Sequence, residues 1–178
     1  MIAVFLANGF EEIEALAVVD ILRRAELDVS IVGVGVTTPV GAHKIPVIVD
    51  VFEKELAIFD LTAVILPGGM PGTLHLEESE VVQEALRYAM ENNLPVGAIC
   101  AAPSILGHKG YLNGLKATCY PGFESALEGT VLMDGVVTDG NVTTGCGPGV
   151  AVDFALELVR RLVSEEMATS IREAMQCR

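Results

Sequence analysis

The sequence is poor in basic residues and contains no long apolar run. Lys and Arg together number 11 against 24 Asp and Glu, which gives the 178-residue chain a net charge of −13. Nucleic acids and anionic membranes bind basic surfaces, so neither is expected as a partner. No apolar stretch approaches the ~20 residues of a membrane-spanning helix, and Met1 leads into apolar residues without the basic region of a signal peptide. We therefore expect a cytoplasmic protein.

Cysteine is also scarce. The chain has four cysteines, too few and too irregularly spaced for a disulfide framework or a Cys-x-x-Cys zinc site: Cys100, Cys119, Cys146 and Cys177. We expect neither a metal nor a cofactor. Hydrophobic residues, in contrast, make up 51% of the chain, and only 20% of the residues are charged. This composition predicts a folded protein, and the length suits a single domain of residues 1–178.

Apolar runs of strand length alternate with segments of helical periodicity. The runs predict strands at residues 2–7, 28–34, 62–69 and 95–100, and shorter strands near 116–119, 130–133 and 141–144. Helical spacing predicts helices at 11–25, 79–92, 149–163 and 165–175. Residues 43–51 are also strand-like, but Pro46 favours an edge strand or an excursion from the main sheet. The alternation predicts an α/β fold with a mostly parallel sheet covered on both faces.

Three turns follow predicted strands, at residues 7–14, 66–72 and 100–103. Ligands of open parallel sheets bind outside the carboxyl ends of the strands, so these turns should open at one edge. They would bring together Cys100, Glu14 and the backbone of residues 68–69. Taken alone, a cysteine is more often a small buried apolar residue than a nucleophile, and Glu14 could belong to a solvated helix start. Only their convergence favours a functional interpretation.

Four segments in register resemble the ThiJ/PfpI superfamily, in the DJ-one-like branch of the parkinsonism-associated protein deglycase. They are "NGFEEIEAL", "VILPGGMPG", "AICAAP" and "GPGVAVDFALELV", and the resemblance runs from Ile2 to about Val163. It implies a flavodoxin-like α/β sandwich with a cysteine nucleophile elbow, and a homodimer. Cys100 takes the position of the reactive cysteine, and Glu14 that of the acid that hydrogen-bonds the thiolate.

Further residues of this chain resemble positions in the superfamily's site. The backbone amides of Gly69 and Ala101 resemble its anion-binding part, and Arg24 and Lys44 resemble basic positions near the dimer contact. Tyr120 stands where the deglycase branch often has a histidine. A phenol has a pKa near 10 and is a poor base at neutral pH, so general-base work would fall mainly to Glu14.

Departures from the superfamily exclude two of its activities. The PfpI-type peptidases have histidine directly after the cysteine, where this chain has Ala101. Class I glutamine amidotransferases need a His-x-Glu pair, and none of the three histidines belongs to one: His43, His75 and His108. Cys146 replaces the arginine that many relatives have before "GPG". It or Cys119 could act as a resolving thiol for oxidised Cys100, although both could simply be packed in the interior.

Two functions fit this thiol. Only a thiolate attacks carbonyls or peroxide; a helix N-terminus lowers the thiol pKa, and an ionised carboxylate nearby would raise it. Glu14 would therefore be useful in its protonated form, which burial favours. The first hypothesis is a glyoxalase- or deglycase-type enzyme acting on methylglyoxal, similar small dicarbonyls or their protein adducts, in the oxidative and carbonyl stress response. The alternative is a redox-sensing or chaperone-like homodimer in which an oxidant converts Cys100 to sulfinate, with little turnover. A third role, in thiamine thiazole metabolism, has no residue in its support.

Overall fold

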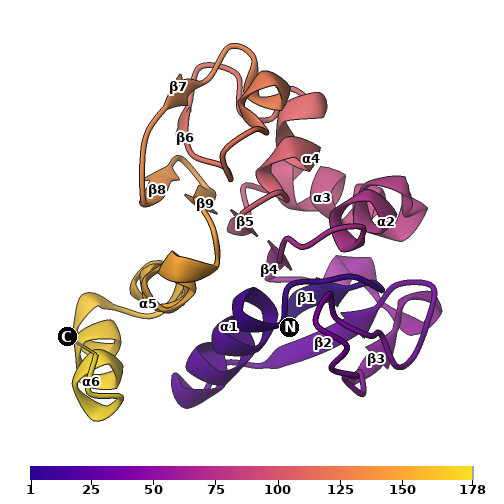
Figure 1. Cartoon of the computed structure of the whole chain (residues 1–178). Helices are drawn as coiled ribbons and strands as arrows, with labels where there is room; N and C mark the ends of the chain where they lie inside the picture. The colour runs from indigo at the N-terminus through magenta and orange to yellow at the C-terminus, as the bar shows by residue number, and fades with distance from the viewer. Residues whose placement is uncertain (178) are drawn as a thin grey trace.

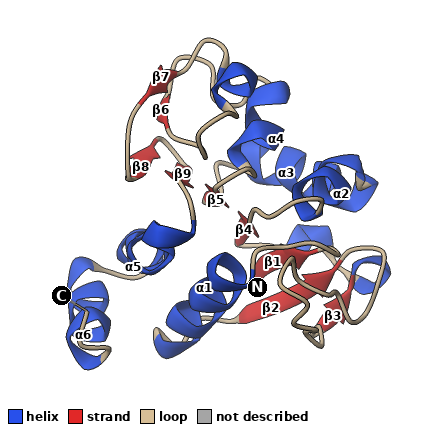
Figure 2. Cartoon of the chain, viewed as in Figure 1, coloured by secondary structure: helices blue, strands red, loops and turns tan. Residues whose placement is uncertain are grey.

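The computed structural model describes residues 1–177, and its centre is a seven-stranded sheet (Figure 1, Figure 2). The strands of this sheet are β1 (Ile2–Leu6), β2 (Val29–Gly33), β3 (Val51–Phe52), β4 (Ala63–Leu66), β5 (Val96–Ile99), β8 (Val136–Asp139) and β9 (Val142–Gly145). Their order is β3-β2-β1-β4-β5-β9-β8, with β8 antiparallel to β9 and the other neighbours parallel. The strands β6 (Lys116–Ala117) and β7 (Val131–Leu132) form a separate small sheet.

Helices cover both faces of the sheet, as Figure 1 shows. One face carries α1 (Glu12–Arg24), α5 (Ala151–Leu162) and α6 (Glu165–Ala174), and the other carries α2 (Gly72–Glu78), α3 (Glu80–Glu91) and α4 (Pro103–His108). Single turns of 3-10 helix lie at Glu53–Glu55, Ile58–Asp60, Glu124–Leu127 and Pro148–Val150. The longest described helix, α1, has 13 residues. None in the described part of the chain is both long and apolar enough to cross a membrane.

The apolar strands divide their side chains between two cores. In β1, Val4 and Leu6 pack with α1 and α5, while Ala3 and Phe5 pack with α2, α3 and α4 on the opposite face. Side chains of a strand alternate between the two faces, so a strand buried on both sides must be apolar throughout. This requirement is why the continuous apolar runs indicated a mostly parallel sheet, and the prediction is confirmed.

Of the two alternatives for residues 43–51, an edge strand or an excursion from the main sheet, the structure shows an excursion over most of the segment. Pro46 takes part only in an isolated antiparallel bridge with Val40, and β3 begins at Val51. Lys44 has a φ of 72° and its N–H donates to the Gly41 carbonyl at 3.0 Å, so the backbone bonds of this segment close a turn. Pro46, which has no N–H, cannot continue a ladder. The short elements β8 and α2 were not predicted, because neither is long enough to show a clear period.

Candidate active site

Backbone hydrogen bonds join the turns that follow β1 and β4. The N–H of Glu11 donates to the Gly68 carbonyl at 2.9 Å, and the N–H of Gly72 donates to the Gly9 carbonyl at 3.3 Å. The turn after β5 is tied to two other segments. Cys100 N–H donates to the carbonyl of Gly145, the last residue of β9, at 2.8 Å, and its own carbonyl accepts from the N–H of Tyr120, also at 2.8 Å. The sheet topology thus gathers four segments around one cysteine.

Cys100 lies on a sharp turn between β5 and α4. Its φ is 64°, in the left-handed region that residues other than glycine seldom adopt, and such a conformation costs of order 1–3 kcal/mol. The strand before it holds the backbone in the sheet. On the helix side, the Ser104 hydroxyl donates to the Ala101 carbonyl at 2.7 Å and fixes the start of α4. The turn therefore has the strained backbone expected of a nucleophile elbow and places Cys100 at the carboxyl edge of the sheet.

Glu14 is fully buried on α1 and faces the same turn. Its Oε2 accepts the N–H of Gly68 at 2.7 Å, whereas its Oε1 is buried without a partner among the described residues. A Cβ atom at Gly68 would lie 2.8 Å from Cβ of Cys100 and 2.8 Å from Oε2 of Glu14. A glycine is therefore required at residue 68, because any side chain would separate the thiol from the carboxyl group.

The two groups shift each other's acidity. Burial raises the pKa of Glu14 from its ordinary 4.5 to about 7, against the hydrogen bonds to Cys100 and Gly68, which act to lower it. Burial also raises the pKa of the Cys100 thiol to about 12, and the ionised Glu14 adds to this rise through its charge and its hydrogen bond. Above pH ~7 the pair therefore holds one proton, which lies mainly on sulfur.

In the state in which Glu14 is ionised, the expected rise of the thiol pKa beside a carboxylate is therefore larger than the lowering expected of a helix terminus. The helix α4 has only 6 residues, and loss of water and the neighbouring charge dominate. The backbone N–H groups of Ala101 and Gly69 do act on the thiol pKa in the lowering direction. They are the donors available to a thiolate once the proton moves to Glu14.

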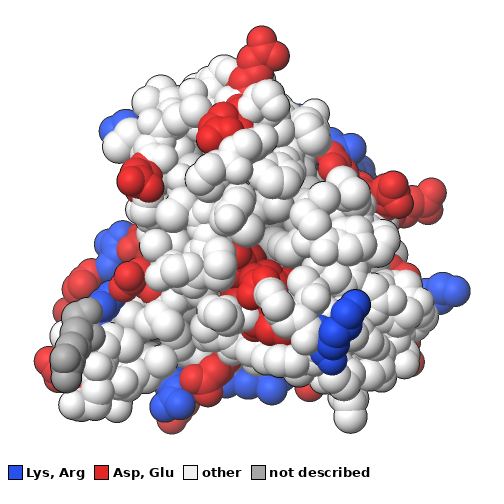
Figure 3. Space-filling model, viewed as in Figure 1, with Lys and Arg blue, Asp and Glu red and all other residues white. Residues whose placement is uncertain are grey.

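A cavity of about 220 Å³ opens over these groups. It is lined by Glu11, Glu14, Gly69, Met70, Cys100, Ala101, Tyr120, Phe123 and Pro148. Five residues predicted for the site, Cys100, Glu14, Tyr120, Gly69 and Ala101, are therefore found together. Figure 3 shows acidic atoms gathered in the hollow at the middle of the viewed face, over the start of α1, with basic atoms away to its sides.

Two predicted residues do not line this cavity within one chain. Arg24 is in the last turn of α1, where its Nε donates to Asp20 Oδ2 at 2.7 Å. Lys44 lines a neighbouring cavity of about 270 Å³, which shares Met70 with the first. Their role in anion binding stays a prediction that would need a second copy of the chain.

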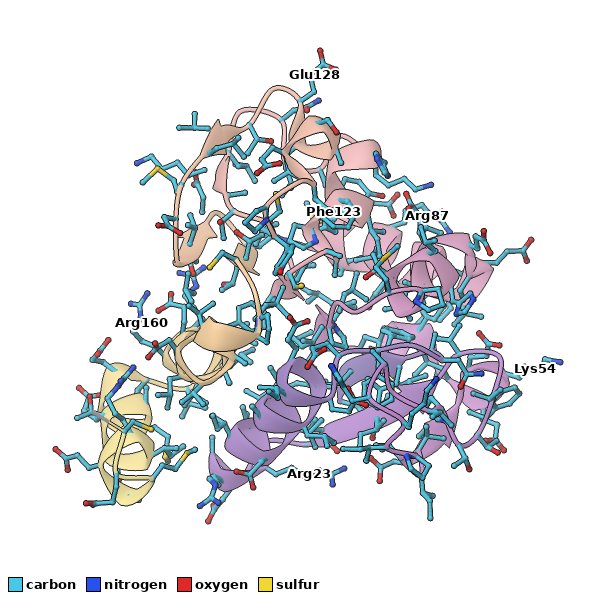
Figure 4. All side chains as sticks on the ribbon, viewed as in Figure 1. Arg23, Lys54, Arg87, Phe123, Glu128 and Arg160 are labelled. Carbon is cyan, nitrogen blue, oxygen red and sulfur yellow. The ribbon has the colours of Figure 1, made fainter. Side chains whose placement is uncertain are left out.

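Sequence reasoning missed four residues that line the cavity. Glu11 and Met70 are direct neighbours of predicted site segments, and Pro148 stands in the quoted "GPG". Phe123 had no signal of its own, because it belongs to an irregular loop. Figure 4 places it next to α4.

One further cluster lies beside the cavity, at Glu11, Glu12 and His43. Its potential ligand atoms lie within 4.8 Å of one another, a spacing that could hold a metal ion. The oxygens of Glu12 already have partners, however. Oε1 accepts the His43 N–H at 2.7 Å, and Oε2 lies 2.8 Å from His43 Nδ1. The cluster therefore holds the loop at residues 41–45 against the start of α1.

Comparisons with known proteins find relatives that match most of the chain. The model of the DJ-1/PfpI family matches residues 1–161. "Protein DJ-1 homolog B" of Arabidopsis thaliana is 36% identical over 178 residues, covering 97% of this chain but 40% of that protein, so the chain spans less than half of this relative. "Glutathione-independent glyoxalase DJR-1.2" of Caenorhabditis elegans is 36% identical over 168 residues, covering 90% of this chain and 87% of that protein. The structure of "Toxoplasma gondii DJ-1, oxidized" has a TM-score of 0.94 at 29% identity, covering 98% of this chain and 97% of that one.

Proposed function

The chain belongs to the DJ-1/PfpI family, and from this premise we propose that it is a cysteine-dependent enzyme of the glyoxalase or deglycase type. Its substrates would be small dicarbonyls such as methylglyoxal, or their protein adducts. The observation that carries the proposal is the closeness of the Cys100 thiol to the buried Glu14 carboxyl group, whose Oε1 has no hydrogen-bond partner among the described residues. A group with a pKa of about 7 can accept and return a proton at neutral pH.

Conversion of methylglyoxal needs water but no external oxidant or reductant, because the aldehyde carbon is oxidised while the ketone carbon beside it is reduced. In the first step, the thiol of Cys100 passes its proton to Glu14 and the sulfur bonds to the aldehyde carbon. The carbonyl oxygen then takes up that proton, which gives a hemithioacetal. The N–H groups of Ala101 and Gly69 would stabilise the thiolate during the transfer.

In the second step, Glu14 is ionised again and removes the proton from the former aldehyde carbon. It returns this proton to the neighbouring carbon while the hydroxyl proton on the former aldehyde carbon passes to the former ketone oxygen, and the hemithioacetal becomes the thioester of a 2-hydroxy acid. Water attacks the thioester, the carbon–sulfur bond breaks, and the thiol regains its proton. The product is lactate. Tyr120, whose ring lines the cavity, can hydrogen-bond a substrate oxygen.

Lactate release from methylglyoxal tests this proposal. We expect the purified chain to form lactate and Cys100→Ser to form none above the uncatalysed rate. Cys177→Ser is a matched control, because Cys177 follows α6 and does not line the cavity. Wild-type protein without lactate formation, or full activity in Cys100→Ser, would refute the proposal.

A redox-sensing homodimer is the second candidate, and the half-buried position of Cys100 favours it. An oxidant could reach the sulfur through the cavity, and the N–H groups of Gly69 and Ala101 could hold the oxygens of a sulfinate. In this case mild peroxide adds two oxygens to Cys100, and no lactate forms at any pH.

We also propose that the chain is one cytoplasmic domain that forms a homodimer. Exposed apolar side chains are found on α1, at Ile13 and Leu16, and in the loop after β2, at Ile45 and Ile48. The loop is joined to this end of α1, since the N–H of Gly9 donates to the Val40 carbonyl at 2.8 Å. Arg24 and Lys44 would then lie near the contact between the two copies.

A further inference from the structure

On the basis of the proposed function, we infer that the site selects uncharged dicarbonyls with an aromatic or large apolar substituent and disfavours anionic ones. Apart from Cys100, the cavity combines two carboxyl groups with an apolar wall and contains no Lys, Arg or His among its described lining residues. The wall decides which substituent is accepted, and the carboxyl groups decide which charge is accepted.

The wall consists of Met70, Tyr120, Phe123 and Pro148. Tyr120 and Phe123 share one turn, in which the Phe123 N–H donates to the Tyr120 carbonyl at 3.1 Å. The ring of Tyr120 rests on Gly147, where a Cβ atom would lie 3.1 Å from Cδ2 of the ring. Phe123 packs partly into the core beneath α4, next to which Figure 4 shows it. Phe123 is thus partly buried, whereas Tyr120 is 45% exposed and borders the cavity from its open side.

The volume favours a ligand larger than methylglyoxal. At ~30 Å³ per molecule of liquid water, the cavity of about 220 Å³ corresponds to roughly seven waters. A three-carbon substrate would leave much of this space to water. A planar aryl ring beside the reacting carbonyl would instead replace that water and contact the wall.

The charges around the cavity disfavour an anion. Glu11 and Glu14 both line it, and the charge of Glu11 adds to the rise in the pKa of Glu14. The nearest partner of Glu11 is the exposed imidazole of His43, with its Nδ1 3.6 Å from Glu11 Oε2. A carboxylate on the substrate would therefore enter beside two acidic groups in a partly dehydrated site, where like charges repel strongly.

Three glyoxals test this selectivity with the full chain: methylglyoxal, phenylglyoxal and 4-carboxyphenylglyoxal. Phenylglyoxal should exceed methylglyoxal in kcat/KM by about tenfold, within the range of roughly 10–200-fold that apolar pocket contacts give. The anionic 4-carboxyphenylglyoxal, of nearly the same shape, should fall below phenylglyoxal by about tenfold. Products are measured as mandelate, lactate and 4-carboxymandelate.

Two variants connect the selectivity to its residues. Phe123→Ala should lower the phenylglyoxal-to-methylglyoxal ratio about tenfold, mainly through KM, whereas Glu11→Gln should raise kcat/KM for the anionic substrate relative to phenylglyoxal. Phe59→Ala is the matched control, because Phe59 is 79% exposed and contacts Tyr88 away from the cavity. It should leave all ratios unchanged.

A second measurement does not need turnover. Acetophenone and 4-acetylbenzoate are unreactive stand-ins, and we expect the neutral ketone to protect Cys100 from iodoacetamide at lower concentration than the anion. If nothing is turned over but this order holds, the proposed function fails and the selectivity stands. Equal turnover of all three glyoxals with equal protection overturns the selectivity alone. Preference for the anionic compounds also overturns it, and would assign Arg24 or Lys44 of a second copy to the site.

Discussion

Replacing Glu14 with glutamine should stabilise the fold at alkaline pH and change it little at acidic pH. The folded-state pKa of Glu14 is raised from 4.5 to about 7, because burial deprives the carboxylate of water. The folded chain therefore binds this proton more tightly than the unfolded chain does. As a result, the free energy of unfolding falls as pH rises from ~4.5 to ~7 and stays low above that range.

The size of the effect follows from the shift. A change from 4.5 to about 7 spans about 2.5 pH units, and at ~1.36 kcal/mol per unit the cost is about 3 kcal/mol. Glutamine stays neutral at every pH, so the variant does not have this cost of burying a charge. Its amide oxygen can keep the bond to the Gly68 N–H, and its amide nitrogen would take the position of Oε1, which has no partner among the described residues. The free energy of unfolding of Glu14→Gln, relative to that of wild type, should therefore rise by about 3 kcal/mol as the pH goes from 4.5 to 8.5.

Urea unfolding at constant protein concentration across this pH range measures the difference. Glu12→Gln is the control with the opposite sign. Burial acts to raise the pKa of Glu12, but its hydrogen bonds to His43 and Ile45 lower it on balance. Glu12 therefore contributes stability above its unfolded pKa that is lost as pH falls, and Glu12→Gln should destabilise the fold most at high pH. If the gap between Glu14→Gln and wild type does not widen with pH, Glu14 does not titrate near 7 and cannot be the proposed proton carrier.

Three other predictions concern the thiols and the assembly. Alkylation of Cys100 by iodoacetamide should show no pH midpoint below ~10 in wild type, since the pKa of its thiol is raised to about 12. In Glu14→Gln alkylation should begin at lower pH, because this variant lacks the charge that adds to the rise. Equal pH profiles would contradict the effect of Glu14 on the thiol pKa. After mild peroxide, mass spectrometry should show oxygen adducts on Cys100 and no internal disulfide, because Cys119 is buried in the core and neither Cys119 nor Cys146 is among the lining residues of the cavity that Cys100 faces; a disulfide to Cys119 or Cys146 would show the resolving thiol that the sequence left open. Sedimentation should give a dimer at micromolar concentration that Ile48→Glu dissociates and Phe59→Glu does not, since both side chains are exposed but only Ile48 lies in the loop proposed to form the contact; monomeric wild type would contradict the homodimer.

The sheet was predictable because its strands lie between two layers of helices. Burial on both faces demands apolar residues at every position, and runs such as residues 2–6 and 63–66 show that demand directly in the sequence. Residues 43–51 are also rich in apolar side chains, yet they form a turn and a loop. Their side chains are largely exposed or half-exposed, so the same pattern there does not report on burial in a sheet.

Part of the site was predictable for a similar reason. Turns that follow parallel strands must open at one edge, so Cys100, Glu14 and Gly69 could be placed together before their contacts were known. Phe123 and Glu11 could not be assigned, because membership of a cavity depends on how separate loops lie against each other. Arg24 and Lys44 lie outside the cavity of a single chain for the same reason.

The sequence by itself determined the α/β sheet, the edge at which the site opens and the pairing of a thiol with a carboxyl group. Each depends on strand burial, chain topology or residue chemistry, which are properties of local segments. Only the tertiary structure decided the acid–base state of that pair and the shape of the cavity above it. The thiol pKa is set by how much water reaches the sulfur and by its closeness to the Glu14 charge. Both depend on distances between residues far apart in the chain, which no local pattern encodes.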